Sequence, residues 1–184
     1  MRLQQNLPAP LFNLPDIYGR TIDLEQYRNN KILIGFFRHA GCPFCNLRVH
    51  ALTKVHAEML GKGLKMIFFF ESKSSQLLRS TFHQEVSPIP LIADPEKKWY
   101  KTYGLEPSIG KSALSHLTTF VQTAMKASSA GVPIHMMKSG ESFSTMPAEF
   151  LIREGLIIDS VHYSERLNDR LSVEAIRSFA DTRD

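Results

Sequence analysis

The sequence predicts an α/β fold in which a central mixed β-sheet is flanked by helices. Two apolar runs, the unbroken residues 32–37 and residues 64–70, are typical of strands that are buried on both faces. Between them, apolar residues recur at helical spacing from Phe44 to Leu60. A strand, a helix and a strand within about 40 residues form a βαβ unit, whose strands are parallel. The length of 184 residues fits one domain, residues 1–184, with a full core.

The N-terminal part of the chain predicts a hairpin and a short helical turn. Residues 11–22 carry Pro15, Asp16 and Gly19 between short apolar stretches, which indicates a hairpin or a turn. The polar residues 24–30 follow directly and form the expected helical turn.

The middle of the chain predicts two helices around a short strand. The first helix begins at Ser74 or Ser75 and continues toward residue 85, since the prolines of residues 87–90 cannot continue a helix. Residues 91–93 form the strand. Asp94-Pro95 then predicts a helix start, with Asp as the N-cap and Pro at the first helical position, and Gly104 predicts its end.

The C-terminal third predicts a long helix, a loop, a hairpin and a final helix. The long helix covers residues 111–130 and the loop residues 131–144. Strands at 150–152 and 156–163 form the hairpin, and a capped helix covers residues 172–180. One apolar stripe on the long helix indicates core packing, with a dimer contact as the alternative. Its members are Ala113, Leu114, Leu117, Phe120, Val121, Ala124 and Met125.

Composition and charge exclude several classes of protein. The formal net charge is +4, and the basic residues are scattered without a clustered run, so we expect no nucleic-acid partner. No stretch reaches the 18 or more apolar residues of a membrane span, and residues 1–10 lack the apolar region of a signal peptide. We therefore expect a soluble cytoplasmic protein without a membrane partner.

Cys42 and Cys45 are the two cysteines of the chain, and their position favours redox chemistry. They lie where the first buried strand ends and the helix begins, and reaction sites of α/β folds lie beyond the carboxyl ends of strands. A helix N-terminus stabilises a thiolate, and residues three apart share a helix face. Pro43 fits the first turn. We expect Cys42 near the N-cap, exposed and activated, with Cys45 one turn deeper.

Positive charge surrounds this pair in the sequence. Arg38 and His39 precede the cysteines, and Arg48 follows Cys45 by about one turn. Cations close to a thiol favour its ionised form. His39 is either a proton donor or a loop residue.

Metal binding is an alternative interpretation of the cysteine pair. His39, His50 and His56 would have to complete a zinc site, but His50 and His56 are six residues apart on one helix and point in different directions. A pair of buried structural thiols is the other alternative. We expect no metal and no cofactor.

Four segments of the chain together resemble the peroxiredoxin-like redoxins of the alkyl hydroperoxide reductase/thiol-specific antioxidant (AhpC/TSA) family, in the thioredoxin-like superfamily. The resemblance covers most of the chain and implies a thioredoxin-like fold. The segments are PAPLFNL at 8–14, FFRHAGCPFCNLR at 36–48, PLIADP at 90–95 with Tyr103-Gly104, and MPAEFLI at 146–152. The last one is similar to the cis-proline loop, which would present the Met146 backbone before Pro147 to a substrate. An ordinary trans proline before a strand is the alternative.

The active-site segment departs from the usual peroxiredoxin pattern Pro-x-x-x-Thr/Ser-x-x-Cys. Aligned on the final cysteine, Cys45 would attack peroxide, Cys42 replaces Thr/Ser and Arg38 replaces Pro. The arginine that usually precedes the late strand has no evident counterpart, and Arg153 lies past that strand. The Cys-Pro-Phe-Cys pair itself looks more like a glutaredoxin or thioredoxin site, in which the first cysteine is the nucleophile.

These features predict a thiol-dependent redox enzyme. Thiol–disulfide oxidoreduction is the leading hypothesis, with attack by Cys42 and resolution by Cys45. A peroxidase that reduces hydroperoxides and a non-catalytic redox sensor or binding module are the alternatives. The expected partners are a disulfide or hydroperoxide substrate and a reductant of the thioredoxin or glutathione type, with a homodimer as a further expectation.

Overall fold

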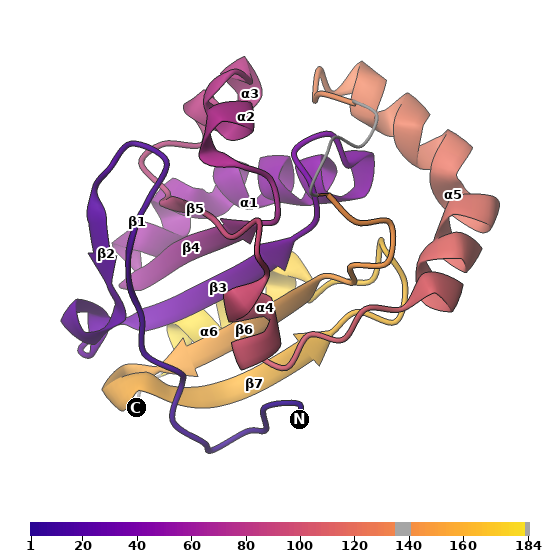
Figure 1. The fold of residues 1–184 in the computed structure, drawn as a ribbon. Helices are drawn as coiled ribbons and strands as arrows, with labels where there is room; N and C mark the ends of the chain where they lie inside the picture. Colours follow the sequence, from indigo (N-terminus) through magenta and orange to yellow (C-terminus); the bar gives the residue numbers. More distant parts are fainter. Residues whose placement is uncertain (135–140, 183–184) are drawn as a thin grey trace.

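A computed structural model describes residues 1–134 and 141–182, except for the side chains of residues 81, 114–118 and 120. A five-stranded mixed sheet in the order β5-β4-β3-β6-β7 forms its centre (Figure 1). The strands β3 (Lys31–Phe37), β4 (Leu64–Phe70) and β5 (Leu91–Ala93) are parallel. The hairpin of β6 (Ala148–Arg153) and β7 (Ile157–Tyr163) joins β3 in antiparallel orientation. The expected α/β class and its mixed sheet are confirmed.

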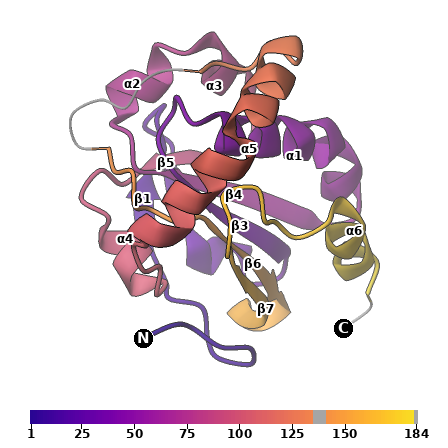
Figure 2. The same cartoon turned by 90° about the vertical axis from the view of Figure 1, so that its right-hand side faces the viewer.

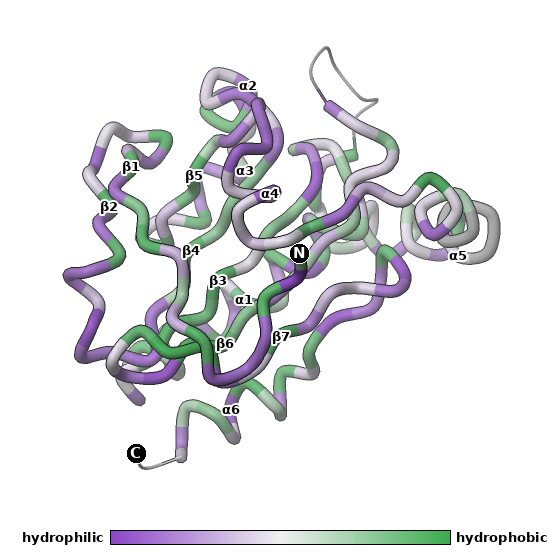
Figure 3. Tube along the Cα trace, turned by 60° about the horizontal axis from the view of Figure 1, so that its bottom comes forward, coloured by the Kyte–Doolittle hydropathy of each residue, from purple (hydrophilic) through white to green (hydrophobic). Residues whose placement is uncertain are grey.

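Two hydrophobic clusters cover the two faces of the sheet. Helices α1 (Pro43–Gly61) and α6 (Val173–Asp181) pack on one face, and α4 (Lys98–Thr102) packs on the other together with the N-terminal segment (Figure 1). Both faces are covered, which explains why β3 and β4 are almost entirely apolar, with Lys31 and Lys65 as the exceptions. Figure 3 shows these strands as the most hydrophobic part of the trace.

The predicted N-terminal and C-terminal elements are confirmed. β1 (Asn13–Pro15) and β2 (Thr21–Asp23) form the hairpin, and a 3-10 turn, η1 (Leu24–Tyr27), follows it. A second 3-10 turn, η2 (Glu154–Leu156), joins β6 to β7. Ser172 caps α6, because its hydroxyl accepts a hydrogen bond from the Ala175 N–H.

The predicted single helix of residues 74–85 is wrong, because two short helices occupy this stretch. α2 (Ser74–Leu78) and α3 (Thr81–Glu85) are separated at Ser80, which has an extended backbone and is the N-cap of α3. The Ser80 hydroxyl lies 2.8 Å from Nδ1 of the buried His83. Serine competes for helical hydrogen bonds through its side chain, so it favours a helix start over a helix interior.

The helix predicted to begin at Pro95 begins three residues later. Residue Lys97 is the N-cap of α4, and the chain from Asp94 to Lys97 forms a turn closed by a backbone hydrogen bond. The carboxylate of Asp94 still stabilises the helix start, because it accepts hydrogen bonds from the N–H groups of Lys98, Trp99 and Tyr100 at 2.7–3.4 Å. The predicted stop at Gly104 is confirmed, with φ +74° directly after the C-cap.

The long helix α5 (Ile109–Ser129) is confirmed, but its apolar stripe is not core packing where the structure describes it. Val121 and Met125 are 71% and 68% exposed, whereas Ser112, Thr123 and Ala127 are buried. The helix packs against α1 at the rim of the molecule (Figure 2), and its buried residues among the described side chains are small or polar. Leu114, Leu117 and Phe120, and residues 135–140 of the predicted loop, lie outside the described side chains and residues. The homodimer stays a prediction.

Candidate active site

The three parallel strands end at one edge of the sheet, and polar side chains follow each of them. Arg38 follows β3, Glu71 follows β4 and Asp94 follows β5, and all three are buried. Cys42 begins α1 at the same edge. The carboxyl ends of parallel strands are the usual place of reaction sites in α/β folds.

The dithiol lies at the start of α1 as predicted, but it is not exposed. Cys42 is the N-cap, Pro43 is in the first turn, and the Cys42 carbonyl accepts hydrogen bonds from the N–H groups of Cys45 and Asn46. Cys42 is 1% and Cys45 0% exposed, and both belong to a hydrophobic cluster that includes Met146. The predicted exposure of Cys42 is wrong, since the apolar residues of this cluster cover it.

Arg38 contacts both sulfur atoms. Its backbone N–H donates to Cys45 Sγ at 3.3 Å, and its Nη1 lies 3.8 Å from Cys42 Sγ. Its Nη2 donates to the carbonyls of Ser142 and Phe143 at 3.4 and 3.0 Å. The guanidinium is therefore fixed between the dithiol and the segment that precedes β6.

The two thiols have opposite pKa shifts. Burial raises the pKa of Cys42, but hydrogen bonds from the Cys45 thiol and backbone N–H and the charges of Arg38 and Arg170 outweigh it and lower this pKa to about 6. Burial, followed by the hydrogen bond and the negative charge of Cys42, raises the pKa of Cys45 well above its ordinary value. These opposite shifts favour ionisation of Cys42 before Cys45.

Arg48 does not act on the dithiol, in contrast to the prediction. Its Nε and Nη2 donate to the two carboxylate oxygens of Glu149 at 2.7 and 2.8 Å, and both side chains are buried. Glu149 lies opposite Gly35 on the neighbouring strand, where a side chain would collide with the ring of Phe37. Side chains alternate along a strand, and those of Ala148 and Phe150 belong to the cluster on the other face, so the Glu149 carboxylate faces α1 and neutralises the charge of Arg48.

Arg170 is a further charged side chain near the site that the sequence analysis did not single out. Its side chain is 7% exposed, and its charge lowers the pKa values of both cysteines. It lies 125 residues or more after the dithiol in a polar stretch without helical or strand periodicity. A buried arginine in such a stretch leaves no local sequence pattern, so its position near the dithiol becomes evident only in the folded structure.

His39 and two glutamates hold the segment of residues 141–145 over this edge of the sheet. His39 Nδ1 lies 3.6 Å from Glu141 Oε2, and the His39 carbonyl accepts the Cys42 N–H at 3.0 Å. Glu71 accepts hydrogen bonds from the Ser142 N–H and the Thr145 hydroxyl at 3.1 and 2.6 Å. The described contacts of His39 place it in the packing of this segment, and its role as a proton donor stays a prediction.

Met146 belongs to the same hydrophobic cluster as the two cysteines, but the peptide bond between Met146 and Pro147 is trans. The cis bond among the described residues is Ser87–Pro88. The Pro147 carbonyl already accepts a hydrogen bond from the Ser164 N–H at 3.1 Å, so the chain enters β6 in an extended conformation. The alternative of a trans proline before a strand is the correct one.

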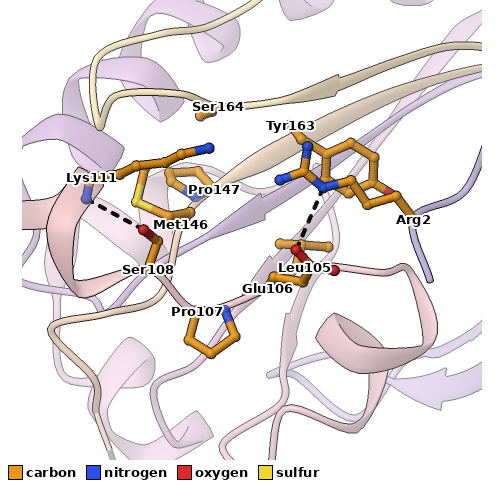
Figure 4. Close-up of a pocket in the computed structure, with 10 residues that line it drawn as sticks. All are labelled: Arg2, Leu105, Glu106, Pro107, Ser108, Lys111, Met146, Pro147, Tyr163 and Ser164. Atoms are coloured by element: carbon orange, nitrogen blue, oxygen red, sulfur yellow. Dashed lines mark hydrogen bonds and ion pairs between the residues drawn. The ribbon is translucent and has the colours of Figure 1, made fainter.

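Met146 also lines two adjoining hollows of about 190 and 230 Å³. Figure 4 shows the first of them, with Arg2 and Glu106 on one side and Lys111 on the other. Neither cysteine is a lining residue of these hollows, and Met146 is the lining residue that shares a hydrophobic cluster with the dithiol.

Comparison with known proteins finds a matching family model and relatives that carry peroxiredoxin names. The model of the AhpC/TSA family matches residues 6–159. A protein of Mycobacterium tuberculosis strain H37Rv that carries the name of a peroxiredoxin is 26% identical over 124 residues, which is 65% of this chain and 78% of that protein. Peroxiredoxin Bcp of Escherichia coli K12 is 24% identical over 97 residues, 53% of this chain and 62% of that protein.

Solved structures with the same fold include both peroxidase and disulfide-exchange proteins. Peroxidoxin BcpB from Mycobacterium tuberculosis superposes with a TM-score of 0.69 at 13% identity, over all of both chains. A thiol:disulfide interchange protein DsbE from Chlorobium tepidum superposes with a TM-score of 0.65 at 17% identity, over 97% of this chain and 98% of that one. Among the described residues, no helix has the length and apolar character needed to cross a bilayer. The chain belongs to the AhpC/TSA family of thiol-dependent redox enzymes, which have a thioredoxin-like fold.

Proposed function

We propose that this protein is a thiol–disulfide oxidoreductase in which Cys42 attacks the substrate and Cys45 resolves the intermediate. The observation that carries the proposal is the asymmetry of the pair: Cys42 is the N-cap of α1 with Arg38 Nη1 at 3.8 Å from its sulfur and a lowered pKa, whereas Cys45 is fully buried one turn later and its pKa is raised. An attacking thiolate and a resolving thiol are the two groups that disulfide exchange requires.

The two steps of the exchange follow from this arrangement. The Cys42 thiolate attacks one sulfur of a substrate disulfide, forms a mixed disulfide and releases the other sulfur as a thiolate. Cys45 then loses its proton and attacks Cys42 Sγ, which releases the second substrate sulfur and leaves the Cys42–Cys45 disulfide. A reductant of the thioredoxin or glutathione type would return the dithiol by the same steps in reverse.

Surrounding residues support these steps. Arg38 stabilises the negative charge on Cys42, and its backbone N–H donates to Cys45 Sγ. Met146 and Pro147, which line the hollow of Figure 4 beside the dithiol cluster, would guide the chain of a disulfide substrate. Since Cys42 is buried, the substrate must displace part of the surface above it before the sulfurs meet.

Hydroperoxide reduction is the second candidate, and the peroxiredoxin names of the relatives favour it. In this reaction a thiolate attacks one peroxide oxygen, gives a sulfenic acid and releases an alcohol or water; the second thiol then condenses with the sulfenic acid and releases water. The family pattern would place the attack on Cys45. The raised pKa of Cys45 argues against this assignment and favours Cys42 for either reaction.

The two candidates are separated by single substitutions. For disulfide exchange, Cys42→Ser abolishes reduction of a model disulfide substrate, and Cys45→Ser accumulates a mixed disulfide that mass spectrometry detects. The rate of thiol loss with hydrogen peroxide, compared with free cysteine, is measured on the same samples. A rate many orders of magnitude above free cysteine, retained in Cys42→Ser, would establish a peroxidase that starts at Cys45. Full activity of both variants in both assays would refute any role of the dithiol, which would leave the redox sensor or binding module.

A further inference from the structure

One peptide group at the end of β3 connects a tyrosine of α4 with the second cysteine of the dithiol. The Tyr100 hydroxyl donates to the Phe37 carbonyl, and the Arg38 N–H donates to Cys45 Sγ at 3.3 Å. The Phe37 carbonyl and the Arg38 N–H belong to the same peptide bond. Because a trans peptide directs these two groups to opposite sides, the connection crosses the sheet from the face of α4 to the face of α1 (Figure 1).

Tyr100 is held in place by its helix and by the aromatic cluster around it. The residue is 2% exposed, and its ring packs edge-on against Phe36 with 5.1 Å between the ring centroids. Its backbone N–H is one of the three that the Asp94 carboxylate accepts at the start of α4. The cap that fixes the start of this short helix therefore also fixes where the Tyr100 hydroxyl lies.

The surroundings of Tyr100 keep its hydroxyl protonated, so that it can act as a donor. Burial, followed by the negative charges of Glu71, Asp94 and Cys45, raises the pKa of this phenol well above its ordinary value. Both carboxylates accept hydrogen bonds from other groups, among them a lysine, a threonine and the helix N–H groups. The hydroxyl donates to the Phe37 carbonyl and to neither carboxylate in the described contacts.

The resolving step requires ionisation of Cys45, which burial opposes. In the reduced pair, the hydrogen bond and the negative charge of Cys42 raise the Cys45 pKa further. A mixed disulfide at Cys42 removes these two causes and leaves burial. The Arg38 N–H favours the charged form of Cys45, because a hydrogen bond to a thiolate is stronger than one to a thiol. Hydrogen bonds in a chain polarise one another, so a donor on the carbonyl of the same peptide strengthens this N–H as a donor.

We propose that Tyr100 is a positioning residue for the resolving step: its hydroxyl polarises the peptide group at the end of β3, whose Arg38 N–H then stabilises the Cys45 thiolate. This inference rests on the proposed function, in which Cys42 attacks and Cys45 resolves. In the step concerned, Cys45 loses its proton to water and its sulfur bonds to Cys42 Sγ. The bond between Cys42 Sγ and the substrate sulfur breaks, and the substrate leaves as a thiolate. The Cys45 sulfur is oxidised and the substrate sulfur is reduced.

Tyr100→Phe removes the hydroxyl and retains the ring. Tyr103→Phe is the matched control, because Tyr103 is also buried and its hydroxyl donates at 2.9 Å to the Pro10 carbonyl of the N-terminal segment. Each reduced protein is mixed with an equimolar amount of the aromatic disulfide dithiobis(nitrobenzoate) in a stopped-flow instrument. Attack by Cys42 releases one nitrothiobenzoate anion, and resolution by Cys45 releases the second. The absorbance of this anion therefore reports the two steps as separate phases.

We expect Tyr100→Phe to slow the second phase about threefold and to leave the first phase unchanged, since the lost polarisation acts on Cys45. The pH at which the second phase reaches half of its maximal rate should rise by about half a unit, which corresponds to the same factor. Tyr103→Phe should match the wild type in both phases. A wild-type second phase in Tyr100→Phe, or an equal slowing of both phases, would overturn the inference.

A measurement that retains Tyr100 keeps the inference testable if Tyr100→Phe does not fold. Coupling between two groups is reciprocal, so removal of the sulfur acceptor in Cys45→Ala should weaken the hydrogen bond of the Tyr100 hydroxyl. Proton NMR of the reduced wild type and of Cys45→Ala compares the hydroxyl resonances of Tyr100 and Tyr103. We expect an upfield shift for Tyr100 and no change for Tyr103, and an unchanged Tyr100 resonance would contradict the connection.

Failure of the proposed function is a separate result. The wild type would then release no nitrothiobenzoate from Cys42, although the Tyr100 resonance would still respond to Cys45→Ala.

Discussion

At the scale of single residues, the site depends on the difference between two cysteines one helical turn apart. Both are buried, and burial alone would raise both pKa values. Cys42 differs because it is the N-cap and receives hydrogen bonds from Cys45 in addition to the charges of Arg38 and Arg170. The first ionisation therefore occurs at Cys42, and its charge then suppresses ionisation of Cys45.

The lowered pKa of Cys42 predicts how the stability of the reduced protein depends on pH. A thiol in the unfolded chain ionises near pH 8.5, whereas Cys42 in the folded protein ionises near pH 6. Between these values the unfolded state binds one more proton than the folded state. The free energy of unfolding should therefore rise with pH by up to about 1.4 kcal/mol per unit from pH 6 to 8.5, and this contribution is lost as pH falls through 6.

Urea denaturation of the reduced protein at half-unit pH steps measures this dependence. Cys42→Ser is the control, because it lacks the titrating group and retains its other neighbours. The difference between the two proteins isolates Cys42 from all other titrating residues. Parallel curves for the two proteins between pH 6 and 8.5 would contradict the assignment of the thiolate to Cys42.

At the scale of elements, side-chain caps fix where the helices around the site begin. Asp94 gives a quantitative prediction, since its carboxylate accepts three N–H groups at the start of α4. Asp94→Ala removes these bonds and should lower the free energy of unfolding by about 1–2 kcal/mol. Chemical denaturation measures the loss. Glu96→Ala, an exposed carboxylate two residues later, is the control, and an equal loss in both variants would refute the capping role.

The same elements show which features the sequence predicts and which it does not. Local signals are sufficient for β3, α1 and β4, because apolar runs and helical spacing are properties of neighbouring residues. They locate the dithiol at the start of α1 for the same reason. The partners of Arg48 and Arg170 are contacts between distant segments, and the burial of Cys42 depends on Met146, about 100 residues later. Such features require the folded chain.

At the scale of the whole molecule, Glu149 connects the layers that carry the site. It lies on β6, binds Arg48 of α1 through two hydrogen bonds, and accepts the Leu171 N–H from the segment that leads into α6. The Glu149 carboxylate thus links the central sheet to α1 and to the segment before α6, the two helices that pack on the same face. The orientation of α1, and with it the position of Cys42, depends on this connection.

Removal of one partner from this connection should destabilise the protein more than removal of both. Arg48→Met leaves Glu149 as a buried carboxylate with less compensation and should cost about 3–5 kcal/mol. The double variant Arg48→Met/Glu149→Leu removes both charges and should recover much of that loss, although Arg170 then loses its nearest anion.

The pair of Arg177 and Glu58 provides the control, because it has the same bidentate geometry but both side chains are 40% exposed. Arg177→Met should therefore leave the urea midpoint almost unchanged. Urea denaturation of the four proteins, combined as a double-mutant cycle for the buried pair, measures the coupling. Additive effects of Arg48→Met and Glu149→Leu would show that the two side chains contribute independently, and the connection between α1 and β6 would then depend on apolar packing alone.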